Sequence, residues 1–172
     1  MSLTLTELNA SSDSKFVAYL EDVAEHSTWV VERAVEHRPF TSLRSLHHTI
    51  CDVIAQASSR EQRALIMAHP DLAGKAARAG DMTDASISEQ AGAGLDQLTD
   101  EEFERFEELN GAYRSKFGFP FIIAVKGHDK TSILQAFVER LENDMKSEQR
   151  EALAQICEII RYRLETMISH EQ

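Results

Sequence analysis

Apolar residues recur at intervals of three and four along much of the chain, which is the spacing of one face of an α-helix. The clearest stripe, on a helix that we expect to begin near Ser147, comprises Leu153, Ile156, Cys157, Ile160, Leu164, Met167 and Ile168. A second stripe runs from Phe103 to Phe117 behind Thr99-Asp100-Glu101-Glu102, which has the pattern of a capping box. The pattern predicts two long amphipathic helices.

Shorter stretches with the same periodicity predict further helices. They span Ser14 to Glu25, Thr28 to Glu36, Leu43 to Ala57, Arg60 to Ala68, Ser86 to Gly92 and Thr131 to Glu142. The chain has only three prolines and seven glycines, so it offers few hairpin turns. We therefore expect an all-α fold, a compact single-domain multi-helix bundle that spans residues 1–172.

The run Phe117-Gly118-Phe119-Pro120-Phe121-Ile122-Ile123-Ala124-Val125-Lys126-Gly127 breaks the helical pattern. Its glycines, proline and β-branched residues favour extended chain, so we expect an extended, buried segment near 119–126. An all-helical protein has no sheet to pair such a segment. Its N–H and C=O groups must therefore bond to side chains, water or a ligand. A ligand with a polar ring could bind to these groups.

Composition excludes several classes of function. The 29 acidic and 18 basic residues give a formal charge of −11, which opposes binding to a phosphate backbone, so we expect no nucleic-acid partner. The acidic residues are spread along helices, which indicates a solvated surface. No apolar run is long enough for a membrane span, and the N-terminus lacks the pattern of a signal peptide. We expect a soluble, cytoplasmic protein with no membrane partner.

The cysteines and histidines do not suggest a metal centre. Cys51 and Cys157 lack the spacing of a zinc site or of a redox pair, which favours two reduced core thiols over a bridge. His47-His48 and the scattered histidines form no ligand motif. Ala91-Gly92-Ala93-Gly94 lacks the strand and spacing of a nucleotide fingerprint. We expect neither a metal nor a nucleotide cofactor.

The stretch from His69-Pro70 to Gln90 is the best candidate for an active site. Proline disfavours a helical residue before it, so the helix before His69 should end there and leave the imidazole at a helix terminus. Ser86, Glu89 and Gln90 share one face of a helix. Ser86-x-x-Glu89 is also a capping-box pattern, and an isolated histidine is often structural, so each signal alone stays ambiguous.

Two arginines flank the apolar stripe of the last helix. Arg161 and Arg163 could each reach solvent or turn toward a carboxylate, and periodicity does not choose between them.

Together these motifs resemble the OHCU decarboxylase family of uric acid degradation. The resemblance rests on His69-Pro70-Asp71-Leu72, Ser86-x-x-Glu89-Gln90 with Ala93-Gly94-Leu95, Leu109-Asn110-x-x-Tyr113, Phe117-Gly118-Phe119-Pro120-Phe121-Ile122 and Arg163-Leu164. Weaker matches at Ser27-x-Trp29 and Arg38-Pro39-Phe40 extend it over nearly the whole chain. The ordered set is far more specific than any one of its motifs.

The resemblance implies a cofactor-free, usually dimeric enzyme, a carbon–carbon lyase that acts on a small-molecule substrate. It would convert 2-oxo-4-hydroxy-4-carboxy-5-ureidoimidazoline into S-allantoin and carbon dioxide, with His69, Glu89 and Arg163 as the catalytic residues. The implied substrate-binding residues are Pro70, Ser86, Ile87, Ser88, Glu89, Gln90, Phe121, Ile122, Ile123, Ala124 and Val125. Two alternatives remain: a non-catalytic acidic helical interaction module, and an amidohydrolase that acts on a related ureide.

Overall fold

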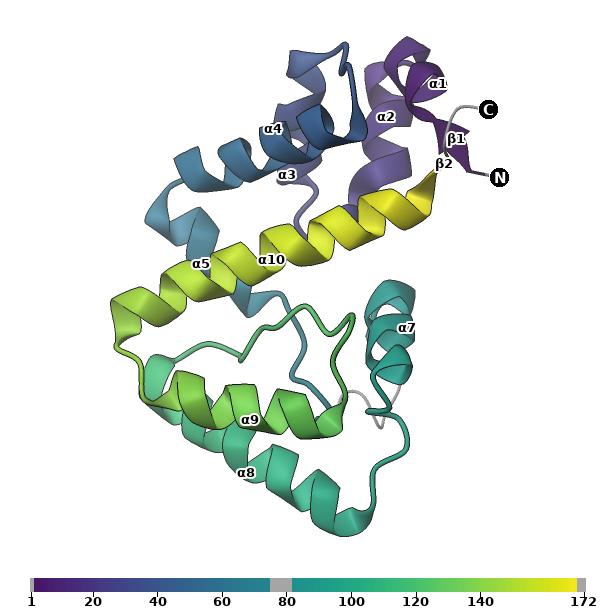
Figure 1. Cartoon of the computed structure of the whole chain (residues 1–172). Helices are drawn as coiled ribbons and strands as arrows, with labels where there is room; N and C mark the ends of the chain where they lie inside the picture. Colours follow the sequence, from purple (N-terminus) through teal and green to yellow (C-terminus); the bar gives the residue numbers. More distant parts are fainter. Residues whose placement is uncertain (1, 75–81, 170–172) are drawn as a thin grey trace. The chain divides into compact units, whose positions relative to one another are not determined.

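The structure, a computed structural model, describes residues 2–74 and 82–169, and its helices confirm the all-α prediction (Figure 1). The chain divides into two compact units. The first, here called the terminal unit, comprises residues 1–68 and 157–172, and the second, the central unit, comprises residues 69–156. The expectation of a single domain stays a prediction.

Apart from α1, the helices of the terminal unit begin and end close to the predicted positions. They are α1 (Leu5–Ala10), α2 (Asp13–Leu20), α3 (Trp29–Ala34), α4 (Leu43–Gln56), α5 (Ser59–Met67) and the second part of α10 (Met145–Met167). Single turns of 3-10 helix, η1 (Glu21–Val23) and η2 (Val35–His37), replace the predicted last turns of α2 and α3. Turns of 3-10 helix are common at the ends of α-helices, where the chain passes into a connecting segment.

Two features of the terminal unit were not predicted. Helix α1 begins with a capping box, in which Thr4 accepts a hydrogen bond from the Glu7 N–H and Glu7 accepts one from the Thr4 N–H. Strands β1 (Leu3–Thr4) and β2 (Ile168–Ser169) form a two-residue parallel ladder, with Leu3 opposite Ile168. Strands this short carry no periodicity that a sequence could reveal.

The central unit is built from α7 (Asp84–Gly92), α8 (Asp100–Phe117), α9 (Lys130–Leu141) and the first part of α10. Helices α8 and α9 pack side by side, and the extended chain from 120 to 125 connects them (Figure 1). The predicted capping box of α8 is confirmed, because Thr99 and Glu102 each accept a hydrogen bond from the other's N–H. Among the described helices, even the longest lacks an apolar stretch that could cross a membrane.

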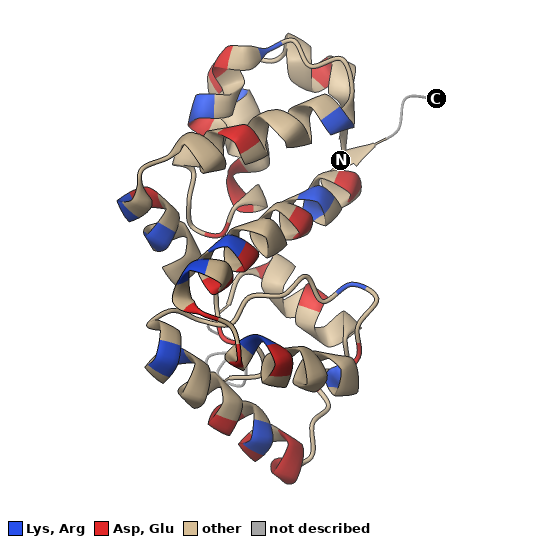
Figure 2. Ribbon diagram, turned by 60° about the vertical axis from the view of Figure 1, so that its left-hand side comes forward, with Lys and Arg blue, Asp and Glu red and all other residues tan. Residues whose placement is uncertain are grey.

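Charged residues of both signs are interspersed along the helices of each unit (Figure 2). Acidic residues gather in the first turn of α8, at Asp100, Glu101 and Glu102, where the partial positive charge of a helix N-terminus favours them. This distribution matches the solvated acidic surface that the sequence predicts.

Aromatic side chains form the core of the central unit and anchor its extended segment. Tyr113 of α8 contacts Phe117, Phe119 and Phe121, with its ring centroid 4.6, 5.9 and 5.3 Å from theirs. Phe121 also stacks on Phe137 of α9 at 3.7 Å. Aromatic contacts of this kind add to the free energy of burial, so the segment is fixed by its alternate side chains.

A buried ion pair secures the same segment through its backbone. Glu148, which is fully buried, accepts hydrogen bonds from Arg140, Tyr113 and Asn143. Arg140 also donates to the carbonyl of Ile122. Burial alone would raise the pKa of Glu148, but the hydrogen bonds from Arg140, Tyr113 and Asn143 outweigh it and hold that pKa below its ordinary value. The carboxylate therefore stays charged and joins α8, α9 and α10.

The lowered pKa of Glu148 predicts an acid-sensitive contribution to stability. A carboxylate whose pKa is depressed by folding stabilises the protein fully above its unfolded value, near 4.5, and loses that contribution as the pH falls through the folded pKa. Glu148→Gln should lower the free energy of unfolding by about 3 kcal/mol at neutral pH, because a buried pair is broken.

Urea denaturation from pH 7 downward tests this prediction, with the exposed Glu101→Gln as the control for loss of one charge. The gap between wild type and Glu148→Gln should narrow below pH 4.5. A gap that does not change with pH would contradict the assignment.

Candidate functional site

His69 lies directly after a helix end, as predicted. Helix α5 ends at Met67, Ala68 caps it, and His69 and Pro70 begin a non-helical loop. The His69 side chain is 6% exposed. Since proline prevents the helix from continuing, the imidazole is held at a defined point of the chain and largely shielded from water.

Side chains of two helices clamp the loop that follows His69. Gln90 of α7 accepts a hydrogen bond from the Ala73 N–H (2.9 Å) and donates one to the Asp71 carbonyl (3.3 Å). Asn110 of α8 donates to the Leu72 carbonyl (2.8 Å). Arg114, one turn further along α8, pairs with the Asp71 carboxylate (3.0 Å). The loop therefore has a single well-defined path between α7 and α8.

The end of this loop leaves little freedom for its residues. Ala73 has φ of 50°, a left-handed conformation that residues other than glycine rarely adopt. A Cβ atom on Gly74 would lie 3.0 Å from the Cβ of Asp71, so a larger residue there would force the loop to move. The clamp by Gln90 and Asn110 offsets the cost of this backbone geometry.

Helix α7 presents the predicted polar face, but its cap differs from one predicted alternative. Thr83 caps the helix and accepts a hydrogen bond from the Ser86 N–H, so Ser86 is not the capping residue. The capping-box interpretation of Ser86-x-x-Glu89 is therefore wrong, because the helix begins two residues earlier than predicted. Ser86 and Gln90 are buried, and Glu89 beside them is half-buried.

Two other predicted contacts on α7 point elsewhere. Ile87 and Ser88 are exposed. Ile87 lines a cavity of about 360 Å³ whose walls are mainly apolar: Ala73, Met82, Ile87, Gln90, Ala91, Leu95, Asp96, Leu98 and Phe103. His69, Ser86 and Glu89 do not line this cavity. Of the three residues on the polar face of α7, only Gln90 lines this cavity.

The extended segment supplies buried peptide groups to the central unit. Residues 119 to 125 are all buried, which confirms the prediction. The Ala124 N–H donates to the side chain of Gln155 (2.9 Å), and the Val125 carbonyl accepts from His128 (2.9 Å). Ile123 makes no hydrogen bond to the described part of the chain. Its N–H and C=O groups are therefore among those that a ligand or water would need to satisfy.

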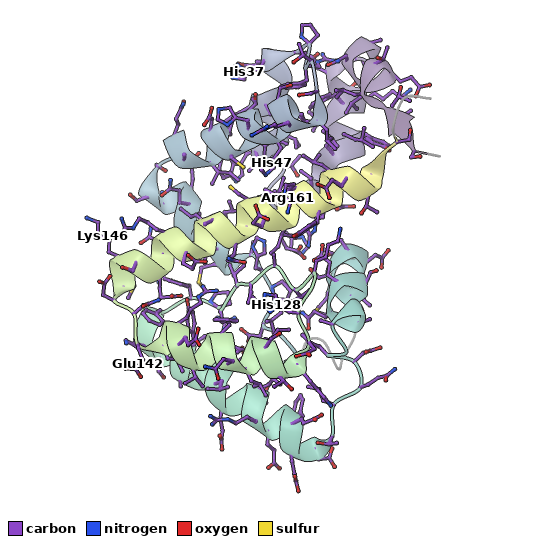
Figure 3. The ribbon with its side chains drawn as sticks, in the orientation of Figure 1. His37, His47, His128, Glu142, Lys146 and Arg161 are labelled. Atoms are coloured by element: carbon purple, nitrogen blue, oxygen red, sulfur yellow. The ribbon has the colours of Figure 1, made fainter. Side chains whose placement is uncertain are left out.

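The two candidate arginines have different surroundings. Arg161 is partly exposed and pairs with Glu158 and Glu165 on its own helix (Figure 3). Arg163 is 6% exposed and donates to the Glu25 carboxylate (2.9 Å) and to the Asp22 carbonyl (3.1 Å). The structure thus answers what periodicity could not, because only Arg163 turns into the protein.

The predicted site residues are divided between the units. His69, Pro70, the α7 residues and Phe121 to Val125 belong to the central unit, whereas Arg163 and its partner Glu25 belong to the terminal unit. Within the described ranges, no group of three or more histidine, cysteine or acidic side chains is arranged to hold a metal ion.

Sequence reasoning missed several residues that position the candidate site. Glu25 follows the end of a helical pattern without any motif, and Gln155 resembles any exposed glutamine on an amphipathic helix. Arg140 and Glu148 look like surface charges, since only burial distinguishes them. A usable signal existed for Asn110 alone, because a polar residue here interrupts the apolar face of α8 between Phe106 and Tyr113.

Comparison with known proteins gives consistent matches over the whole chain. The model of the family described as OHCU decarboxylase matches residues 9–165. The 2-oxo-4-hydroxy-4-carboxy-5-ureidoimidazoline decarboxylase of Haloferax volcanii is 40% identical over 169 residues, covering 98% of each protein. The enzyme of the same name from Halalkalicoccus jeotgali is 39% identical and covers 96% of this chain and 92% of its own.

A solved structure supports the same fold. The crystal structure of an (S)-allantoin synthase superposes with a TM-score of 0.79 at 29% identity and covers 97% of this chain. This chain spans 54% of the length of that protein.

The clamp on the loop after His69 generates a test. Asn110→Leu removes the donor to the buried Leu72 carbonyl, and an unpaired buried group costs about 1–3 kcal/mol. The Oδ1 atom of Asn110 is itself buried without a partner in the described part of the chain, so the donor bond must account for the loss. Urea denaturation should show the decrease, whereas the exposed Gln97→Leu should stay within about 0.5 kcal/mol of wild type. Equal stability of the two variants would contradict the clamp.

Proposed function

Because the chain belongs to the OHCU decarboxylase family, we propose that it converts 2-oxo-4-hydroxy-4-carboxy-5-ureidoimidazoline into (S)-allantoin and carbon dioxide. The near-complete, 40% identical match to the Haloferax volcanii decarboxylase carries this proposal. The protein is then a carbon–carbon lyase of uric acid degradation. Its substrate is a small, polar heterocycle with a carboxylate, a hydroxyl and a ureido group.

The reaction requires two contributions from the protein: proton transfer and the positioning of the substrate. When the bond to the carboxylate breaks, its electron pair must be delocalised and a proton must then be added. The conjugated C=N of the substrate can accept the pair, so the reaction needs no pyridoxal or thiamine group as electron sink. The protein must supply an acid/base group and a rigid polar surround.

His69 is the proposed acid/base group. It would first help to ionise the 4-hydroxyl group or to turn the carboxylate out of the ring plane, and it would then deliver a proton to one face of the ring carbon. One-sided delivery would set the S configuration. This role is supported by the burial of His69 and by the clamp that Gln90 and Asn110 place on the following loop.

Glu89 and the extended segment are the proposed contacts for the ureido and ring amide groups. Glu89 shares the half-buried face of α7 with Ser86 and Gln90, where a carboxylate can accept N–H bonds or orient His69. The peptide groups of Phe121 to Val125 would bind the ring amides, and the unsatisfied Ile123 supports this. Pro70, Ile87 and Ser88 stay predicted contacts.

Arg163 is the proposed ligand for an anionic or carbonyl oxygen of the substrate. Its buried pair with Glu25 fixes the guanidinium plane, and a fixed guanidinium recognises carboxylate oxygens with defined geometry. Removal of Arg163 would also take a partner from the buried Glu25 carboxylate, so a loss of activity in Arg163→Ala must be corrected for a loss of stability.

A homodimeric state and a cytoplasmic location, both expected in the sequence analysis, stay predictions. Light scattering coupled to size-exclusion chromatography would determine the first.

The acid/base role of His69 is tested by His69→Asn, which keeps a similar size but cannot shuttle a proton. We expect kcat/KM to fall at least about 10²-fold, because that is the usual contribution of a positioned acid/base group. Substrate is generated from urate with uricase and hydroxyisourate hydrolase, and the circular dichroism of (S)-allantoin reports the product. His48→Asn, at an exposed position of α4, is the control and should keep wild-type activity. Near-normal turnover by His69→Asn would reject the role.

Variants of Glu89 and Thr83 distinguish a catalytic role from a helix-capping role on α7. Thr83→Ala removes the cap and should cost about 1 kcal/mol of stability while activity is retained. Glu89→Gln keeps the cap and the side-chain size, so it should lower activity with little change in melting temperature. Thermal melts and the allantoin assay on both variants make the comparison. Loss of stability with full activity in Glu89→Gln would assign Glu89 a structural role instead.

A further inference from the structure

The only two cysteines of the chain both lie in the terminal unit, although they are far apart in sequence. Cys51 lies on α4 and Cys157 on α10, and His47 of α4 contacts both of them. Both are free thiols and both are half-buried. The prediction of two reduced thiols without a bridge is therefore confirmed, although both side chains are partly exposed.

His47 contacts both residues through one atom. Its Nε2 lies 2.8 Å from the Cys157 carbonyl oxygen and 3.3 Å from the Cys51 sulfur, between α4 and α10 (Figure 3). A carbonyl oxygen can only accept, so Nε2 carries the proton and donates. The Cys51 sulfur can then accept from the same N–H. His47 therefore holds the Cys51 sulfur close to the backbone of Cys157.

This arrangement makes the two thiols chemically unequal. The hydrogen bond to Cys157 raises the pKa of Cys51, and burial adds to that effect. The same bond lowers the pKa of Cys157, against the opposing effects of burial and of the Glu158 charge. Cys157 is therefore the better nucleophile, because the thiolate is the reactive form.

We propose that Cys51 and Cys157 are a redox-active thiol pair, which a hydroperoxide converts to an intramolecular disulfide in the folded protein. Three observations support it: His47 contacts the Cys51 sulfur, the same His47 atom contacts the backbone of Cys157, and both thiols are partly accessible to a small oxidant. A metal site is the competing use of such residues, but within the described ranges no cluster of ligands is arranged for one. None of these residues takes part in the proposed decarboxylation.

The oxidation proceeds in two balanced steps. The Cys157 thiolate attacks the distal oxygen of the hydroperoxide, the O–O bond breaks, and the alcohol or water leaves after taking up a proton. Cys157 is then a sulfenic acid. The Cys51 sulfur attacks the Cys157 sulfur, the S–O bond breaks, and the released hydroxide takes up the Cys51 proton to form water. Two thiols lose two electrons in all, and the hydroperoxide gains them.

Intact-protein mass spectrometry under non-reducing conditions tests the proposal, with hydrogen peroxide as the probe. The folded protein should lose two hydrogens and both titratable thiols, and dithiothreitol should restore them. Peptide mapping should find Cys51 joined to Cys157. The reaction should be at least about tenfold slower in guanidinium chloride, because unfolding removes the high effective concentration of one thiol at the other.

Variants that lack one cysteine determine which thiol is oxidised first. In Cys51→Ser, dimedone should label Cys157 as a sulfenic acid, because the resolving thiol is missing. In Cys157→Ser, Cys51 should be labelled more slowly. The mass measurement on the unaltered chain stays decisive even if a variant fails to fold. Folded protein that keeps both thiols, forms only intermolecular disulfides, or oxidises each cysteine separately to a sulfinic acid would overturn the proposal.

Discussion

The buried charge of Glu148 is the constraint on which the central unit depends. A carboxylate without solvent must be matched by donors, and Tyr113 of α8, Arg140 of α9 and Asn143 just after α9 supply them. Arg140 has donors left over, and one holds the Ile122 carbonyl. One charge therefore determines both how the helices meet and where a segment of non-helical chain can run between them.

The same logic explains how a helical protein can contain buried, extended chain. The segment from 120 to 125 has no neighbouring strand, so its peptide groups depend on single side chains such as Gln155. Such pairing is incomplete, and Ile123 stays without a partner in the described part of the chain. A peptide group that the protein itself does not satisfy can discriminate among ligands, because a ligand without the matching group leaves it unpaired. In this proposed site, the backbone groups that lack a hydrogen bond within the protein are therefore the source of specificity for the ligand.

Helix positions could be predicted because they depend on local patterns. The stripe in α10, the Thr99 cap and the stop before Pro70 each follow from a few neighbouring residues. The clamp, the Arg163–Glu25 pair and the contact between Cys51 and Cys157 join residues far apart in sequence. No periodicity encodes such contacts, which is why the type of each candidate residue was predicted and its partners were not. The capping prediction at Ser86 failed because Thr83, three residues earlier, caps the helix instead.

Ala73 illustrates how the loop limits the cavity beside it. Its amide donates to Gln90, its φ is 50°, and the residue lines the cavity of about 360 Å³ next to α7. Spare volume beside a small residue normally invites a larger side chain. Here the steric strain of a β-branched or bulky residue in a left-handed backbone conformation would outweigh the free energy gained by filling the cavity. Glycine would relieve that penalty but would enlarge the conformational freedom of the unfolded chain. The dihedral angles of the backbone, and not the room available, therefore decide which residues position 73 can accept.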